Sequence, residues 1–311
     1  MTDGSAAHEL FLEISQWFPS EVAAGAELTF KVRVRCSFGC DLRGTEVLVE
    51  APEGPVITSE LVSWVEGINE TGEVALSAPS GVGEHEWSVS CRPQAGEPPG
   101  HTVISLPLPF STEAHRTSLA IWDMPSPAVI GEPFMAKIGA KCAEGCDLQS
   151  RRIEIYDGSG DRLTTSEFRD GFWPGSDALH WTEVELVAPE TEGVVSWSVA
   201  FPAADLELPH QEACSKFSFS ATRPAAHRVT VEVVETGSTI PVPNAQVSLG
   251  AYRASTGESG RSIVSVAEGT YELVIWKVGY EAPSRALDVS KDLTVRVEVV
   301  VLPDRSSWED D

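Results

Sequence analysis

Two copies of a short cysteine turn are the residues in this sequence best suited to do chemistry. Cys36 and Cys40 lie in the pattern Cys-x-x-Gly-Cys-Asp-Leu, and Cys142 and Cys146 repeat that pattern 106 residues later. Thiols at this spacing can close a local disulfide, bind a soft metal ion, or stay reduced as small apolar groups. In each case the glycine before the second cysteine would supply the positive φ that the reversal needs.

Two further cysteines and two histidines could complete a metal site with these turns. They form one pair per copy, Cys91 with His101 and Cys214 with His210. Four Cys and His ligands per copy would suit tetrahedral zinc. However, Cys91 aligns with Phe201 and not with Cys214, and each copy has one cysteine pair where zinc knuckles usually come in twos. Cys91 and Cys214 are therefore expected to be core thiols and are weaker candidates, as are the two histidines.

Three interpretations of the cysteine turns stay open. A disulfide within a turn would close a very short loop, so its entropic gain would be modest, and a cytoplasmic compartment disfavours it. Reduced thiols that pack as small apolar groups need no cofactor. Zinc is the remaining interpretation. The sequence therefore predicts no obligatory cofactor and one alternative, zinc.

No catalytic motif is present in the sequence. The seven histidines include no His-Glu-x-x-His pair, and the chain has neither a Gly-x-Ser-x-Gly elbow nor a phosphate-binding loop. His115 and His227 stand where the second and third modules begin and are expected to be linker residues. Asp157-Gly-Ser-Gly-Asp161 has alternating oxygen ligands, but its glycine-rich centre favours a hairpin turn over a calcium loop. We expect a protein that is not an enzyme.

The cysteine turns belong to an internal repeat made of short strands. Leu28–Arg35 alternates apolar and polar side chains, which is typical of a half-buried strand. Trp87 and Trp197 correspond at an offset of 110 residues, against 106 at the cysteine turns, so the second copy has four extra residues. An insertion of this kind belongs in a surface loop. Both tryptophans are expected in the core.

These patterns predict an all-β chain of three immunoglobulin-like β-sandwiches in series. Short strands separated by Gly, Pro, Asn and Asp recur over about 100 residues, which is typical of such sandwiches. The expected domains are residues 8–112 and 114–224 for the repeats and 227–303 for a third sandwich, followed by an acidic tail at 304–311.

The third module carries a different set of motifs. It contains Pro241-Val-Pro243-Asn244-Ala245-Gln-Val247, then Gly269-Thr-Tyr271, then Gly279-Tyr280. Over about residues 228–303 it resembles the carboxypeptidase regulatory-like (transthyretin-like, Cna-B-like) β-sandwich. The resemblance implies seven strands, no catalytic residues and a role as stalk, spacer or docking domain. Structural roles are expected for Pro243, Asn244, Gly269, Tyr271, Gly279 and Tyr280.

The charge of the chain limits its partners. With 47 acidic and 22 basic side chains, the formal charge is −25. Such a field repels phosphate backbones and anionic lipid, so nucleic-acid and membrane-surface binding are not expected. The sequence has no apolar run long enough to span a membrane. It also shows no secretory signal at its start, so a cytoplasmic location is expected.

Two functional hypotheses follow from the sequence. The first is a non-catalytic modular binding or scaffold protein whose loops and sheet edges dock to other proteins, including an enzyme or a multi-subunit assembly. The alternative is a metal-binding or redox-sensing protein that uses the two cysteine turns. Metal content and a count of free thiols would separate the two.

Overall fold

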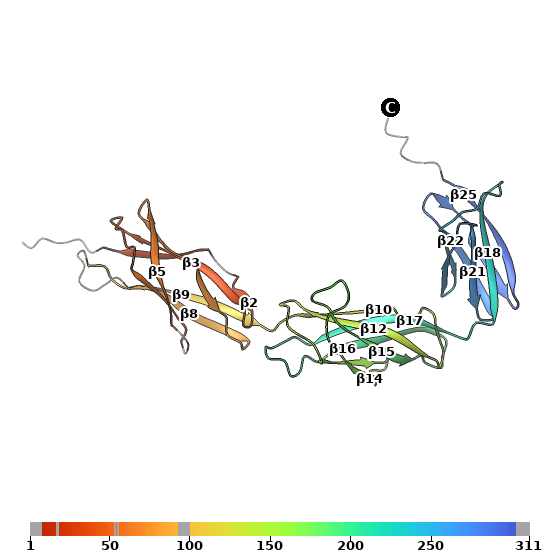
Figure 1. Ribbon diagram of the computed structural model, residues 1–311, viewed down its shortest axis with the longest axis horizontal. Coiled ribbons are helices and arrows are strands. Elements are labelled where there is room, and N and C mark those ends of the chain that lie inside the picture. The colour runs from red at the N-terminus through yellow and green to blue at the C-terminus, as the bar shows by residue number, and fades with distance from the viewer. Residues whose placement is uncertain (1–7, 17–18, 53, 55, 93–99, 303–311) are drawn as a thin grey trace, which may run out of the picture. The chain divides into compact units, whose positions relative to one another are not determined.

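The computed structural model describes residues 8–16, 19–52, 54, 56–92 and 100–302 (Figure 1). Its regular secondary structure over these residues consists of strands, which form three successive β-sandwiches. The predicted fold class is therefore confirmed. The predicted acidic tail at 304–311 lies outside the described residues. No described segment forms a helix that is long and apolar enough to cross a membrane.

The first sandwich is built around a strand that belongs to both of its layers. Val56–Glu60 of β5 pairs with β4, and Leu61–Val65 pairs with β6. One layer holds β1, β3, β6 and β7, and the other holds β4, β8, β9 and β2. The strands are β1 (Leu10–Gln16), β2 (Glu21–Ala23), β3 (Glu27–Cys36), β4 (Glu46–Glu50), β5 (Val56–Val65), β6 (Ile68–Thr71), β7 (Val74–Ser77), β8 (Gly83–Arg92) and β9 (Ile104–Glu113).

Alternation along the strands creates the core of this sandwich. In β3, Phe30, Val32 and Val34 are fully buried, while the residues between them face outward. Trp87 on β8 is 6% exposed and packs edge-on against Phe110. Its counterpart in the second sandwich, Trp197, is 5% exposed. Both tryptophans therefore lie in the cores.

The second sandwich repeats this arrangement in two separate sheets. Their strand orders are β10-β12-β15 and β11-β17-β16-β13-β14. The strands are β10 (Thr117–Trp122), β11 (Ala128–Val129), β12 (Pro133–Cys142), β13 (Arg152–Tyr156), β14 (Arg162–Glu167), β15 (His180–Val187), β16 (Gly193–Phe201) and β17 (Ala213–Thr222). The segment from Asp157 to Asp161 is the β13–β14 hairpin turn, in which the Asp157 carboxylate accepts bonds from the N–H groups of Ser159 and Asp161.

The extra residues of the second copy lie between β14 and β15. Phe168 and Leu61 accept equivalent backbone bonds, and eleven residues separate Phe168 from His180 where seven separate Leu61 from Asn69. The longer connection carries Trp173, which packs edge-on between Trp122 and Trp181 at centroid distances of 5.1 and 4.9 Å. The insertion therefore adds an aromatic cluster outside the repeated framework.

The third sandwich has eight strands in the described residues, not the seven that the resemblance implies. They are β18 (His227–Glu235), β19 (Gln246–Leu249), β20 (Tyr252–Ser255), β21 (Arg261–Val266), β22 (Gly269–Trp276), β23 (Tyr280–Glu281), β24 (Arg285–Val289) and β25 (Leu293–Val301). The sheets have the orders β21-β18-β25-β23 and β20-β19-β22-β24. The additional strand is the two-residue β23 at the edge of its sheet. His227, expected in a linker, is the first residue of β18.

The motif residues of the third module have structural roles. Pro243 and Asn244 form the turn before β19, where Asn244 has a φ of 55°. Gly279 has a φ of 82° at the reversal before β23. The Tyr271 hydroxyl donates to the Ala267 carbonyl (2.9 Å), and the Tyr280 hydroxyl donates to Glu235 (3.1 Å). Gly269 begins β22.

The chain divides into two compact units. The first contains residues 1–118, 142–147 and 202–213, and the second contains the rest. The first unit thus includes the first sandwich together with the second cysteine turn and the segment 202–213, which are parts of the second sandwich.

Candidate metal centres

The two cysteine turns share one backbone geometry. Cys36 is the last residue of β3, and its carbonyl accepts a bond from the N–H of Gly39 (2.9 Å), which has a φ of 67°. The equivalent bond in the second copy joins Gly145, with a φ of 73°, to Cys142 (3.2 Å). A positive φ at the glycine reverses the chain, as the sequence predicts, and returns the second cysteine toward the first.

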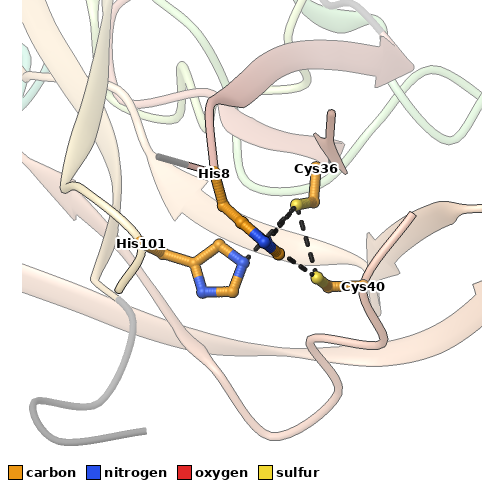
Figure 2. Close-up of side chains that lie close together, drawn as sticks. All are labelled: His8, Cys36, Cys40 and His101. Carbon is orange, nitrogen blue, oxygen red and sulfur yellow. Dashed lines mark hydrogen bonds between the residues drawn. The ribbon is translucent and has the colours of Figure 1, made fainter. Parts of the chain in front are cut away.

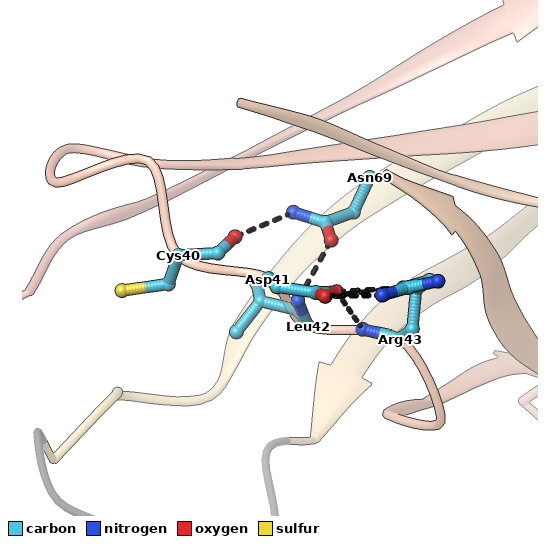
Figure 3. Close-up of polar contacts among 5 residues, drawn as sticks. All are labelled: Cys40, Asp41, Leu42, Arg43 and Asn69. Atoms are coloured by element: carbon cyan, nitrogen blue, oxygen red, sulfur yellow. Dashed lines mark hydrogen bonds and ion pairs between the residues drawn. The ribbon is translucent and has the colours of Figure 1, made fainter. Parts of the chain in front are cut away.

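A buried amide fixes the chain after the first turn (Figure 3). The Asn69 side chain is fully buried, donates to the carbonyl of Cys40 (3.0 Å), and accepts from the N–H of Leu42 (2.7 Å). Beside it, Asp41 forms an exposed ion pair with Arg43 (2.7 Å). The hydrogen bonds from Arg43 lower the pKa of Asp41.

The first cluster brings two histidines onto the cysteine pair (Figure 2). His8 and His101 face each other in an isolated parallel bridge, one before β1 and the other before β9. His8 Nδ1 lies 3.2 Å from Cys40 Sγ and 3.4 Å from Cys36 Sγ. Cys36 Sγ lies 3.4 Å from Cys40 Sγ and 3.5 Å from His101 Nε2.

The second cluster reproduces this arrangement with four equivalent residues. His115 and His210 form the same kind of parallel bridge. His115 Nδ1 lies 3.0 Å from Cys146 Sγ and 3.8 Å from Cys142 Sγ. In both clusters the four ligand atoms all lie within 4.8 Å of one another.

The spacing of these atoms fits a tetrahedral metal ion. With Zn–S bonds of about 2.3 Å and Zn–N bonds of about 2.0 Å, ligand atoms at tetrahedral corners lie roughly 3.3–3.8 Å apart. The interatomic distances given above run from 3.0 to 3.8 Å. Two thiolates and two imidazoles form a donor set that selects soft or borderline ions, above all zinc.

The histidines of the second cluster are held in the tautomers that metal binding requires. His210 Nδ1 donates to the Leu208 carbonyl (2.8 Å), which leaves the lone pair on Nε2. That Nε2 is buried and has no hydrogen-bond partner within the described part of the chain. His115 Nε2 donates to the Ala24 carbonyl (2.7 Å), which leaves the lone pair on Nδ1 facing the sulfurs. Metal-bound histidines usually donate their other ring N–H in this way.

The thiols of each pair differ in how easily they ionise. Burial disfavours the Cys36 thiolate, but hydrogen bonds from Phe38 and Cys40 outweigh it and lower the pKa of Cys36. Burial and the neighbouring Cys36 raise the pKa of Cys40. Burial, Cys142 and Glu144 raise the pKa of Cys146 to about 12. A bound cation would offset the repulsion between two thiolates.

The structure brings six of the eight cysteine and histidine candidates into the clusters. They are Cys36, Cys40, His101, Cys142, Cys146 and His210. Cys91 is fully buried in the first core, where burial raises its pKa to about 11. Cys214 is exposed on β17, so the expectation of a core thiol is wrong there. Along β17 the side chain of Cys214 is exposed, whereas Phe217 and Phe219, on the opposite face of the strand, are buried.

Two members of the clusters were missed by the sequence reasoning. His8 was not singled out, and His115 was expected to be a linker residue; bridges to His101 and His210 turn both toward the sulfurs. An Ala-His pair precedes the first strand of each copy, 107 residues apart and so one residue off the repeat. The same pair, Ala226-His227, also stands at the start of β18, where the sequence has no cysteine turn, so this signal alone would not have been specific.

The cysteines are reduced in the structure. All six, each within the described part of the chain, are free thiols. Cys36 Sγ and Cys40 Sγ lie 3.4 Å apart, whereas a disulfide needs about 2.05 Å. The structure thus places two free thiols and two histidines at each turn, and the choice among disulfide, metal and packed thiols stays a prediction.

Fold and site together define an all-β tandem-sandwich protein with two Cys₂His₂ clusters. No protein-family model matches the chain, and no curated protein matches it. Among solved structures, it is similar to a tetra-tandem repeat from the extending region of a large adhesion protein (TM-score 0.30, 11% identity, covering 96% of this chain and 74% of that one). It is also similar to BcpA, the major pilin subunit of Bacillus cereus (0.23, 8%, 94% and 99%), and to red sea bream transglutaminase (0.31, 13%, 68% and 31%).

Proposed function

We propose that this protein is a non-catalytic modular scaffold whose first two sandwiches each bind one structural Zn²⁺. The observation that carries the proposal is the duplicated set of two thiols and two imidazoles within 4.8 Å. In each centre the candidate ligands come from the end of one strand and the turn after it, and from segments just before two other strands. With four protein ligands, no coordination position stays open for a substrate, which is the mark of a structural site.

Metal content and cobalt spectra test this proposal. Purified under reducing conditions, the full chain should contain two zinc ions, and Co²⁺ should replace them with thiolate-to-cobalt and tetrahedral d–d absorption bands. Cys40→Ser and Cys146→Ser should each reduce the content to one ion. Cys91→Ser and Cys214→Ser, which alter cysteines outside the clusters, should leave it at two. A metal-free wild type that gives no tetrahedral cobalt spectrum would refute the proposal.

The proposed scaffold role rests on the series of β-sandwiches and on the charge of the chain. We propose that the partners are other proteins, bound through loops and exposed sheet edges by strand addition. The charge of −25 disfavours nucleic acid and anionic membranes as partners. We further propose a cytoplasmic location, since reduced thiols persist there.

The third sandwich is proposed to be a carboxypeptidase regulatory-like module that serves as a docking or spacer domain. Its turn at Pro243 and Asn244 and its Gly-Tyr reversal at Gly279 support the assignment. Pull-down with the full chain and with a chain lacking residues 227–302, followed by mass spectrometry, tests its role. Partners that require this module should disappear with the shorter chain, and an unchanged set of partners would contradict the docking role.

A further inference from the structure

The two centres differ in what their histidines contact on the side away from the sulfurs. At the second centre, the imidazole of His115 is 4% exposed and joins two parts of the chain. Its Nδ1 faces Cys146 Sγ (3.0 Å), and its Nε2 donates to the carbonyl of Ala24 (2.7 Å). Ala24 follows β2 in the first sandwich, so a ligand of the second centre is also a contact to the first sandwich.

The segment that carries His210 makes a second contact to the same place. The Leu208 carbonyl accepts from His210 Nδ1 (2.8 Å), and the Leu208 side chain lies over Gly25, where an added Cβ would sit 3.2 Å from its methyl carbons. The backbone of this segment pairs with His115, whose N–H donates to Pro209 (2.8 Å) and whose carbonyl accepts from Gln211 (2.9 Å). His115 thus bonds directly to the Ala24–Gly25 turn, and His210 is connected to it through Leu208.

At the first centre, the ring contacts of His8 join residues of one sandwich. His8 stacks on Phe38 of its own turn at 4.3 Å and packs edge-on against His101 at 5.1 Å. All three residues belong to the first sandwich. Of the two similar centres, the second therefore has a ligand candidate that bonds to the first sandwich.

We propose that the metal ion of the second centre fixes the joint at which the second sandwich meets the first. The proposal rests on the metal-binding function proposed above. A metal on His115 Nδ1 keeps the N–H on Nε2 and aims it at Ala24, and a metal on His210 Nε2 anchors the segment that holds Leu208 over Gly25. The first compact unit agrees with this arrangement, because it joins residues 142–147 and 202–213 to the first sandwich. Occupancy of the second centre and formation of the joint are then linked equilibria, and each must strengthen the other by the same factor.

Hydrogen exchange on the full chain tests one direction of this linkage. Cys146→Ser and Cys40→Ser each remove one ion through a residue outside the joint. Cys146→Ser should speed amide exchange in peptides that cover residues 22–26 by about tenfold, although these lie in the first sandwich. Cys40→Ser removes the ion of the first sandwich itself and should speed exchange throughout that sandwich, without singling out residues 22–26. If Cys146→Ser loses one ion but its amides at 22–26 exchange at the wild-type rate, the proposed joint is refuted. The proposed zinc sites would not be contradicted by that result.

Zinc release tests the reciprocal direction and does not depend on how well the cysteine variants fold. Leu208→Ala keeps all eight ligands but removes the contact with Gly25, so it should speed transfer of one zinc ion to a chromogenic chelator by about tenfold. The other ion should be released at the wild-type rate. Leu206→Ala, a truncation in the same segment, should leave both rates unchanged. If Leu208→Ala also leaves both rates unchanged, the joint is refuted; if the wild type binds no zinc, the proposed function itself fails.

Discussion

Asn69 and His180 accept equivalent hydrogen bonds in the two copies, although one side chain is an amide and the other an imidazole. Asn69 Oδ1 accepts from the N–H of Leu42 (2.7 Å), and His180 Nε2 accepts from the N–H of Leu148 (3.2 Å). Both side chains are buried, and both leucines directly follow a Cys-Asp dipeptide. The segment after each cysteine turn is therefore tied to a neighbouring strand by a side-chain acceptor.

Removing this acceptor should destabilise the first sandwich. Asn69→Ala leaves the Leu42 N–H and the Cys40 carbonyl buried without their partner, which we expect to cost about 3 kcal/mol of unfolding free energy. Urea denaturation followed by tryptophan fluorescence measures the loss. Asp41→Asn, which alters the exposed pair with Arg43 in the same turn, is the control and should leave the midpoint unchanged. Equal midpoints for both variants would contradict the role given to Asn69.

Metal removal should destabilise the first two sandwiches and spare the third. Ligand binding to the native state adds about 4 kcal/mol when the free ligand exceeds its Kd a thousandfold, which corresponds to more than about 10 °C in Tm for a domain of this size. The third sandwich has its own core, and none of its described residues belongs to either cluster. Calorimetry of the full chain should therefore show that a strong chelator lowers the unfolding temperatures of the first two sandwiches. The unfolding temperature of the third sandwich should stay unchanged. A uniform shift, or none, would count against structural zinc.

The two cysteines outside the clusters should respond differently to serine. Cys91 is fully buried among apolar side chains, so Cys91→Ser buries a hydroxyl there and should cost about 1–3 kcal/mol. Cys214 is exposed, and Cys214→Ser should change stability by less than about 0.5 kcal/mol. Denaturant titration measures both, and thiol labelling of the native protein should modify Cys214 far faster than Cys91. Rapid labelling of Cys91 would place it outside the core.

Gly260 should be intolerant of any side chain. Its φ is 70°, and a Cβ there would lie 2.6 Å from the carbonyl oxygen of Val233, a contact that forces the backbone apart. We expect Gly260→Ala to destabilise the third sandwich by about 3 kcal/mol. Gly237 has a similar φ of 72° with nothing within 4 Å, so Gly237→Ala should cost only about 1 kcal/mol. Thermal unfolding of the two variants measures the loss of stability in each. Gly237→Ala reports backbone strain alone, so an equal loss of stability in Gly260→Ala would contradict the steric overlap with Val233.

Local patterns in the chain were enough to predict the fold class, the repeat and the cysteine turns. Alternation along β3 and the repeated glycines at 39 and 145 are local signals, because strand period and turn conformation depend on residues next to each other in the chain. For the same reason the turn at Pro243 and Asn244 and the reversal at Gly279 could be placed from sequence motifs.

Which side chains meet depends on how distant segments pack in three dimensions. His8 and His115 join the cysteines through parallel bridges to residues about 95 positions away, and no local pattern specifies such a pairing. The equivalence of Asn69 and His180 was hidden by the insertion and by the change of residue type. The bond from His115 to Ala24 depends on contacts between domains, which no periodicity encodes. The turns could be predicted from the sequence because they depend on neighbouring residues. The four-residue clusters and the proposed joint arise when distant segments pack together.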